Sequence, residues 1–318
     1  LTDTTGKKSN AQIAREFDAA MNPAGTLGVF TTAKDRSTEL RDAVRAHAGN
    51  GTANGLWAQV TGGKTKLKGI STGAQDLDLD TDAYGLAVGG EAALQNITLG
   101  AAFMGGSGKT ENDSVAGKDD FNYYGISFYA KTQVQGIDLE GDVSAAWLKS
   151  DLTVGGAADV DTDTTTAVYS LGIQAKKTFN LGVDVTPFIG MDVYHIKSDG
   201  FTTNHGVSIE DANATIVEFP IGAEVKKALQ TSSGFSVAPS FSLAVVPTVG
   251  SKDIDSKVRF AGAESTYNYT FADDVKVRSQ LGIEAQKDNF TLGLAAGYDW
   301  GNEERSAASV QLRAKYAF

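Results

Sequence analysis

The sequence contains no cysteine and only 5 prolines among its 318 residues. The absence of cysteine excludes a disulfide scaffold and a thiolate metal site. There is also no run of about 18 apolar residues, which excludes a transmembrane helix. The formal net charge of −11 argues against binding nucleic acid through its phosphates. Glycine is abundant, with 36 residues beside 15 Phe and 10 Tyr, and this balance favours strands and turns.

The first 53 residues form a segment with helical periodicity. Residues 9–22 and 37–48 each carry an apolar stripe with polar residues opposite, which predicts two helices. In the first helix the stripe consists of Ile13, Phe17 and Met21. The stretch between the two helices, "TLGVFTTAKD", is interpreted as an extended link.

From residue 54 onward the apolar period changes to two, as in "VKVRSQLGIEAQ", where apolar and polar residues alternate from Val275. The pattern predicts strands of ten or more residues, longer than the usual five or six in soluble proteins. Twelve are predicted, near residues 54–66, 81–94, 97–110, 119–133, 137–151, 163–179, 182–198, 213–229, 233–250, 274–287, 289–301 and 306–318.

The connections alternate between long polar loops and short turns. The long loops, at 67–80, 111–118, 152–162, 199–212 and 251–273, follow odd-numbered strands, and the short turns follow even-numbered strands. A soluble sandwich has no reason to separate its loops in this way, whereas an outer-membrane barrel does. We therefore predict an all-β protein, a twelve-stranded antiparallel transmembrane barrel with its apolar face toward outer-membrane lipid. An aromatic girdle is expected from Tyr84, Trp147, Phe290, Tyr298, Trp300, Tyr316 and Phe318.

Two helical patterns, the first-strand segment "GLWAQVTGGKTKL" around Trp57 and the terminal "AKYAF" together resemble the translocator domain of Gram-negative type V autotransporters. At the C-terminus, Gln311, Tyr316 and Phe318 fit that family's outer-membrane assembly signal, although Arg313 stands where glycine is preferred. The resemblance implies that the chain anchors and exports an upstream passenger, and that barrel-assembly machinery and periplasmic chaperones are its partners. It also implies a helical segment within the barrel, so we divide the chain into residues 1–53 and the barrel at 54–318.

The polar face of the strands gives the predicted lumen its charge. Acidic residues are densest on the fifth and seventh strands and basic residues on the tenth and twelfth. These charges either pair between neighbouring strands or hold the helix that carries Arg15. The apolar stripe of that helix requires a lumenal aromatic patch, so we predict that Ile13, Arg15, Phe17 and Met21 contact Phe188 and Tyr194.

Signals for other functions are weak. The stretch "GGSGKT" at 105–110 lacks the first glycine of a phosphate-binding loop, because Phe103 occupies that position. None of His47, His195 and His205 is placed beside a serine nucleophile, so we predict no enzyme activity and no cofactor. The acidic stretches "QDLDLDTD" and "DVDTDT" could recruit calcium, but neither follows an EF-hand spacing or a glycine-aspartate nonapeptide, which favours solvated loops. The alternative function is a porin or solute channel, which the long N-terminal segment argues against.

Overall fold

A computed structural model describes most of the chain. The described residues are 27–47, 54–71, 76–112, 117–154, 160–203, 206–260 and 262–318. The predicted helix at 9–22 therefore lies outside the described residues. No helix among the described residues is long and apolar enough to span a membrane.

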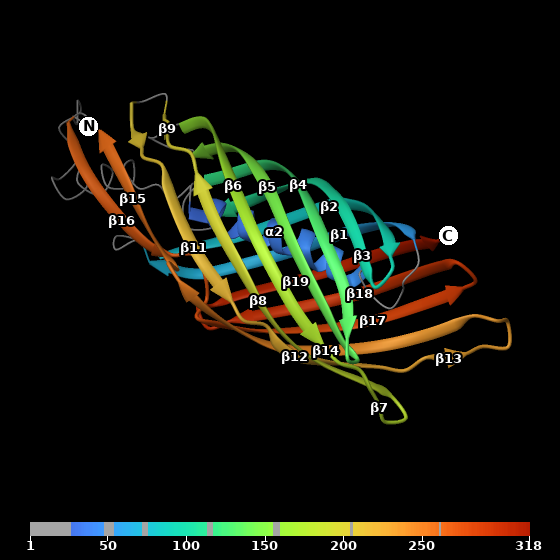
Figure 1. Ribbon diagram of the computed structural model, residues 1–318. Helices are drawn as coiled ribbons and strands as arrows, with labels where there is room; N and C mark the ends of the chain where they lie inside the picture. The colour runs from blue at the N-terminus through green and yellow to red at the C-terminus, as the bar shows by residue number, and fades with distance from the viewer. Residues whose placement is uncertain are drawn as a thin grey trace.

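One helix and a series of long strands make up the structure (Figure 1). The elements are α2 (Leu27–His47), β1 (Gly55–Ser71), β2 (Asp76–Leu94), β3 (Ile97–Asn112), β4 (Gly117–Val134), β5 (Ile137–Val154), β6 (Val160–Lys176), β7 (Phe179–Asn180), β8 (Asp184–Ser198), β9 (Phe201–Thr202), β10 (Ser208–Ile209), β11 (Ala212–Glu218), β12 (Ile221–Lys226), β13 (Leu229–Gln230), β14 (Ser236–Gly250), β15 (Asp253–Phe260), β16 (Ala263–Thr270), β17 (Val275–Lys287), β18 (Phe290–Gly301) and β19 (Arg305–Ala317).

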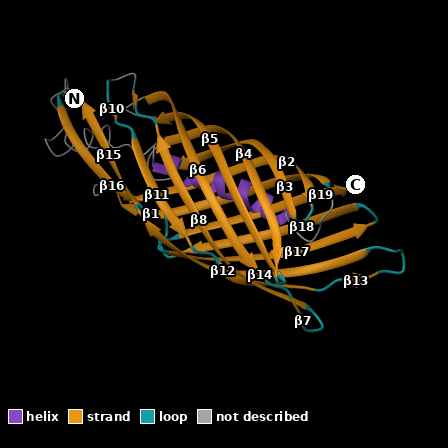
Figure 2. Ribbon diagram, in the orientation of Figure 1, coloured by secondary structure: helices purple, strands orange, loops and turns teal. Residues whose placement is uncertain are grey.

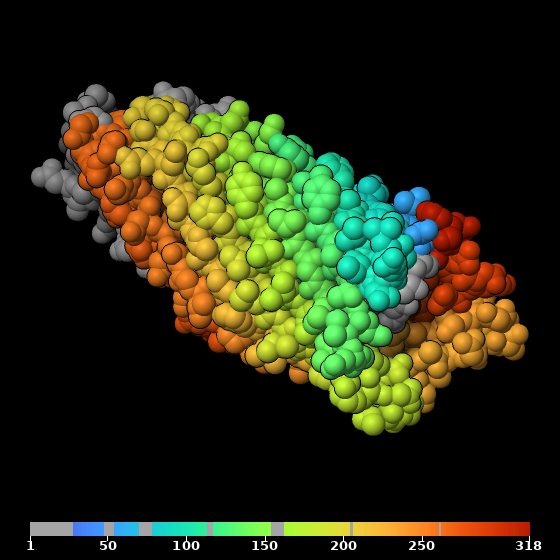
Figure 3. All heavy atoms as spheres, in the orientation of Figure 1, coloured from blue at the N-terminus to red at the C-terminus, as the bar shows by residue number. Residues whose placement is uncertain are grey.

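The strands form a closed antiparallel barrel of twelve strands, as predicted. The barrel strands are β1–β6, β8, β11 with β12 as one divided strand, β14 and β17–β19, and each pairs with the barrel strands before and after it in the chain. β1 pairs with β19 from Gly55↔Ala317 to Leu67↔Arg305, which closes the sheet. Closure leaves no free edge around the wall, so the backbone polar groups of the spanning strands pair with one another. In the space-filling view the wall is continuous on the visible face (Figure 3).

The two ends of the barrel differ. We call the end with the tight connections, such as 95–96 and 288–289, the turn end, and the opposite end the loop end. Apolar side chains alternate outward along each strand, and large ones such as Phe103, Leu171 and Leu281 are about half exposed or more. A lipid-facing surface requires this arrangement. The predicted girdle residues are also on the outside, although Trp147 is only half-exposed because it stacks on Tyr124 with ring centroids 5.3 Å apart.

The predicted loops are partly wrong, because the strands continue into them. β1 and β2 reach Ser71 and Asp76, and the segment 251–273 contains the hairpin β15–β16. Cross-strand ion pairs satisfy the charged residues there: Lys64 Nζ lies 2.9 Å from Asp80 of the "QDLDLDTD" stretch. Such pairing keeps the antiparallel ladder intact beyond the apolar belt. The predicted strand at 213–229 is divided at Phe219–Pro220, since proline has no N–H to donate.

The helix inside the barrel begins earlier than predicted (Figure 2). The link that we interpreted as extended is the first part of α2, which starts at Leu27. Its Gly, Val and Thr residues have low intrinsic helix propensity. They nevertheless lie in a lumen whose wall offers no free strand edge. Their backbone N–H and C=O groups therefore form hydrogen bonds within the segment, as in a helix. Tertiary contacts also stabilise it, since Val29 and Phe30 are buried.

The stretch "GGSGKT" has a packing role. It lies in β3, and a Cβ on Gly106 would come within 2.5 Å of the Tyr123 ring, while one on Gly108 would come within 2.4 Å of the Phe121 ring. Both glycines therefore make room for lumenal aromatic side chains of the neighbouring strand β4.

Candidate functional site: the lumenal helix and its contacts

A row of acidic side chains crosses the lumen wall. Cross-strand register aligns Glu91 with Gly100, Tyr129, Asp142, Gly172, Asp192 and Glu218 on consecutive strands from β2 to β11. We call Glu91, Asp142, Asp192 and Glu218 the acidic row. All four are less than a tenth exposed. Buried carboxylates of this density require cationic partners.

Helix α2 supplies most of those partners from one face. Its Lys34, Arg41 and Arg45 are spaced by seven and four residues, which places them on one stripe of a helix with 3.6 residues per turn. We call these three residues the basic stripe. The Lys34 ammonium lies 2.5 Å from Glu218, and Arg41 Nε lies 3.1 Å from Asp142. Arg45 lies 2.6 Å from Asp192.

Arg41 is the most enclosed of these cations. Its side chain is fully buried, and the guanidinium stacks on the Tyr194 ring at 4.6 Å from the centroid. It also lies 3.7 Å from Asp192, so that it contacts both aspartates at the centre of the acidic row. Stacking and a planar donor fork are properties of arginine that lysine lacks.

Gly172 leaves the space into which the two arginines enter. It lies between Asp142 and Asp192 in the row, and a Cβ there would come within 2.5 Å of Asp142 Oδ1 and 2.7 Å of Arg41 Nε and Arg45. Any other residue at this position would push the guanidinium groups away from the wall. The lack of a side chain at Gly172 therefore allows both arginines to reach the aspartates of the wall.

A second face of α2, about 100° further round the helix, carries the opposite charge. Asp35 lies 2.5 Å from Arg305 of β19, and Asp42 lies 3.3 Å from Arg278 of β17. The acidic residues of the helix thus face the basic wall at β17–β19, while the basic stripe faces the acidic row. This complementarity fixes the rotation of the helix in the lumen.

The third face of α2 is apolar and packs on β4 and β5. Leu40, Ala43 and Val44 are at most 1% exposed. A Cβ on Gly125 of β4 would lie 3.0 Å from the Leu40 side chain, so the helix and the wall are in close contact. Leu40, Ala43 and Val44 form the apolar stripe that was predicted for residues 37–48.

At the loop end, the start of α2 packs against the segment that follows β16. The Phe30 and Phe271 ring centroids are 5.8 Å apart, and the Thr31 hydroxyl donates to the Phe271 carbonyl at 2.9 Å. Arg305, already paired with Asp35, also lies 3.8 Å from Asp273. The helix and this segment together close the loop end with a largely apolar cluster.

At the turn end, α2 stops against the first strand. The His47 ring stacks on Trp57 with centroids 4.3 Å apart, and Lys315 donates to the His47 carbonyl at 3.1 Å. A cation at a helix C-terminus is favourable because the last carbonyls are unpaired. The chain therefore runs through the lumen from the loop end to the turn end before β1 begins.

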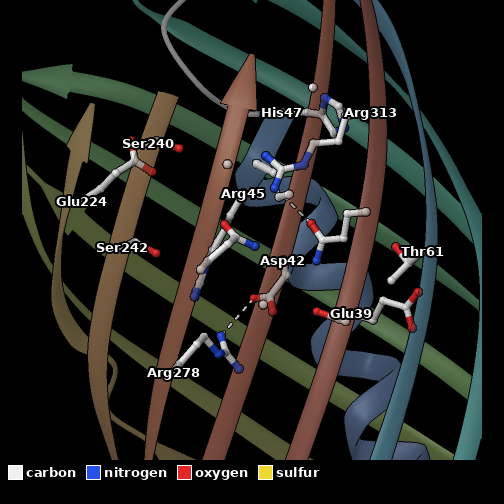
Figure 4. A pocket seen from close by; sticks show the side chains of 18 of the residues that line it. Glu39, Asp42, Arg45, His47, Thr61, Glu224, Ser240, Ser242, Arg278 and Arg313 are labelled. Carbon is white, nitrogen blue, oxygen red and sulfur yellow. Dashed lines mark hydrogen bonds and ion pairs between the residues drawn. The ribbon is translucent and has the colours of Figure 1, made fainter. Parts of the chain in front are cut away.

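The helix does not fill the lumen completely. A cavity of about 620 Å³ remains between the acidic face of α2 and the wall of β12, β14 and β17–β19. Figure 4 shows Glu39, Asp42 and His47 on the helix side, with Arg278, Arg313 and Ser240 on the wall. The cavity extends toward the turn end, where Asn289 and Ala317 line it.

The predicted contact residues are placed as follows. Ile13, Arg15, Phe17 and Met21 lie outside the described residues, so their contacts remain a prediction. Tyr194 is fully buried in the lumen, where its hydroxyl lies 3.1 Å from Thr38 of α2. Phe188 lines the cavity. In the assembly signal, Gln311 points inward, and Tyr316 and Phe318 are exposed with ring centroids 6.4 Å apart.

Both interpretations of the lumenal charges describe part of the structure. Lys176–Glu140, Lys226–Glu284 and Lys315–Glu91 are pairs within the wall. Other wall carboxylates pair with Lys34, Arg41 and Arg45 of α2 and so hold the helix. Lys34 was not predicted as a contact residue, because it lies in the segment that was interpreted as an extended link. The spacing of Lys34 to Arg41 and Arg45 was the signal that could have identified the stripe.

The family model of the autotransporter β-domain matches residues 56–299, which is more than half of the chain. No curated protein sequence matches the chain significantly.

Three solved structures share the fold. The translocator domain of autotransporter NalP from Neisseria meningitidis has a TM-score of 0.71 at 14% identity, covering 91% of this chain and 96% of that one. The transport unit of AIDA-I from Escherichia coli has a TM-score of 0.61 at 15% identity, covering 83% and 90%. The β-domain of the Bordetella autotransporter BrkA has a TM-score of 0.57 at 16% identity, covering 84% and 100%.

The family match favours the translocator interpretation over the porin alternative, and it makes the turn end periplasmic and the loop end extracellular. The chain belongs to the autotransporter β-domain family and is the outer-membrane translocator domain of an autotransporter, which exports a linked passenger and anchors it at the cell surface.

Proposed function

We propose that α2 is retained in the barrel as a plug and tether, so that the translocator is closed once the passenger has been exported. The observation that carries this proposal is the three-sided fit of α2, with each face of the helix against a wall of matching character. Its first residues lie at the extracellular end, where a passenger would leave the barrel. Its last residues lie beside β1, which begins at the periplasmic end.

A disulfide between the helix and the wall tests whether the plug is retained in cells. The Ser37 and Ser170 hydroxyl oxygens are 3.3 Å apart, close enough for cysteines to form a bridge of about 2 Å after a small adjustment. We expect Ser37→Cys with Ser170→Cys to crosslink in intact cells, read as an altered mobility on non-reducing gels. Ser37→Cys with Ser240→Cys, across the cavity, is the matched control. Equal crosslinking of both pairs would contradict a fixed plug.

We further propose that the barrel carries no chemistry of its own. His195 is exposed on the outer face and bonds Thr215 at 2.8 Å, and His47 is stacked at the end of α2. His205 lies outside the described residues. Among the described residues, neither His47 nor His195 is hydrogen-bonded to a serine hydroxyl, which supports the proposal. Chains that remain full-length on the gels of the crosslinking experiment would agree with it, and a cut folded chain would disprove it.

Barrel-assembly machinery and periplasmic chaperones are proposed partners through the C-terminal strand. Tyr316 and Phe318 present exposed aromatic rings at the periplasmic end, which suits recognition before insertion. Deleting Phe318 is expected to lower the amount of heat-modifiable, folded barrel in outer-membrane fractions. The control is Phe103→Ala, which removes an exposed aromatic residue from mid-strand. Equal losses in both variants would exclude a specific terminal signal.

A further inference from the structure

The exposed lysines of the periplasmic turns lie on one side of the rim. On the arc formed by the ends of β6, β12 and β17, Lys177, Lys227 and Lys287 are exposed and do not line the lumenal cavity. On the other side, the turns at 94–97 and 134–137 contain no charged residue. The lysines of this arc are close in space, because β6, β8, β12, β14 and β17 are consecutive neighbours in the barrel.

The same arc carries aromatic rings beneath two of its lysines. The Lys177 ammonium lies 5.4 Å from the centroid of Phe179, and the Lys287 ammonium lies 5.0 Å from the centroid of Phe235. Both rings are exposed, at 45% and 39%. Phe179 and Phe235 lie in the hairpins that contain β7 and β13, which project beyond the adjacent turns in Figures 1 and 3.

Two further apolar side chains complete the surface. Leu181 is 74% exposed and Leu229 is 47% exposed, each in one of the projecting hairpins. In the exposed stretches 177–183, 227–235 and 287–290, Asp288 is the single acidic residue. The arc therefore combines apolar contact area with a net positive charge at the level where a barrel leaves the hydrocarbon.

We propose that this arc, consisting of Lys177, Phe179, Leu181, Lys227, Leu229, Phe235 and Lys287, is a docking surface for anionic phospholipids of the periplasmic leaflet. The apolar side chains contact the first acyl carbons, and the lysines extend to the headgroup phosphates. Long cationic side chains behave in this way at membrane interfaces, where aromatic rings also concentrate. A soluble acidic protein would have to cover the leucines and phenylalanines that already face lipid.

The arc lysines differ from Lys64 and Lys109 near the extracellular rim. Lys64 pairs with Asp80, and Lys109 pairs with Glu111, at 2.9 Å in each case. Paired charges of this kind have little net attraction for an anionic headgroup. The arc lysines, in contrast, have no carboxylate within ion-pair distance among the described residues.

Native mass spectrometry of the purified full chain tests the proposal. The protein is mixed in detergent with equimolar phosphatidylglycerol and phosphatidylcholine of identical acyl chains. We expect the protein to retain phosphatidylglycerol preferentially. The triple variant K177Q/K227Q/K287Q should lose this preference, by up to roughly fivefold for each lysine.

The matched control is K64Q/K66Q/K109Q, which removes the same charge from the extracellular rim and should keep the preference. Heat-modifiable mobility establishes that both variants are folded. Equal preferences in the two variants would overturn the proposal. A further measurement adds glycerol phosphate, which has no acyl chains, as a competitor to the protein–lipid mixture. If it displaces the lipid at equal concentration, the surface binds free phosphate and the lipid interpretation is wrong.

Discussion

Removal of residues 1–50 is expected to turn a nearly closed barrel into an open channel, with single-channel conductance in planar bilayers rising by roughly an order of magnitude. The reason is geometric. An α-helix with its side chains is about 10–12 Å across, comparable to the interior that twelve strands enclose. With α2 in place, the free space beside it is a cavity of about 620 Å³.

Removing the helix also weakens the extracellular closure. Phe271 would lose its contact with Phe30. Arg305 would lose its ion pair with Asp35 and keep only its contact with Asp273. If the segment that follows β16 still blocked the pore, the truncated barrel would conduct poorly. The variant F271S in the truncated chain separates this case, because it removes the largest apolar side chain of that segment. High conductance of the intact chain, equal to that of the truncated chain, would refute the plug and revive the channel interpretation.

The sequence predicts the barrel well because its signals are local. Alternation along a strand such as β17 is imposed by lipid on one side and a wet lumen on the other, so the twelve strands can be recognised one at a time. Loop lengths were less predictable. Beyond the membrane, charged residues such as Lys64 and Asp80 pair on the outer face of β1 and β2, while Leu67 and Leu79 are buried on the inner face. The apolar positions of the lipid-facing part are therefore exchanged with the polar ones, and the pattern that marks a membrane strand is interrupted.

The charge distribution of the lumen wall was predictable, but the helical segment that pairs with it was not. The acidic fifth and seventh strands and the basic tenth and twelfth strands are the walls that face the basic and acidic faces of the helix. The segment that meets them was misassigned, because Gly28, Thr31 and Thr32 have poor helix propensity. Their helical state depends on contacts from Phe271, 240 residues away in the case of the Thr31 hydrogen bond. Single-sequence periodicity contains no information about such a contact.

The second large effect is expected from Arg41→Ala. The substitution leaves Asp142 and Asp192 buried with Arg45 alone, and removing one partner of a buried ion pair typically costs about 3–5 kcal/mol. The free energy lost should appear in the docking of α2, since the wall ladder is unchanged. A loss of about 3 kcal/mol corresponds to faster hydrogen exchange of the α2 amides by roughly a hundredfold.

A mutant cycle separates the ion pairs from simple loss of packing. Asp142→Asn removes the uncompensated charge and leaves Arg45 paired with Asp192, so adding this change to Arg41→Ala should restore much of the protection of α2. Arg41→Lys keeps the charge but cannot stack on Tyr194 and bridge both aspartates, and we expect an intermediate loss. Lys64→Ala, at an exposed pair on the rim, should change α2 exchange little, since surface pairs contribute at most about 1 kcal/mol. If Arg41→Ala left the exchange of α2 unchanged, or if Asp142→Asn simply added to its effect, the acidic row would not be what holds the helix in the lumen.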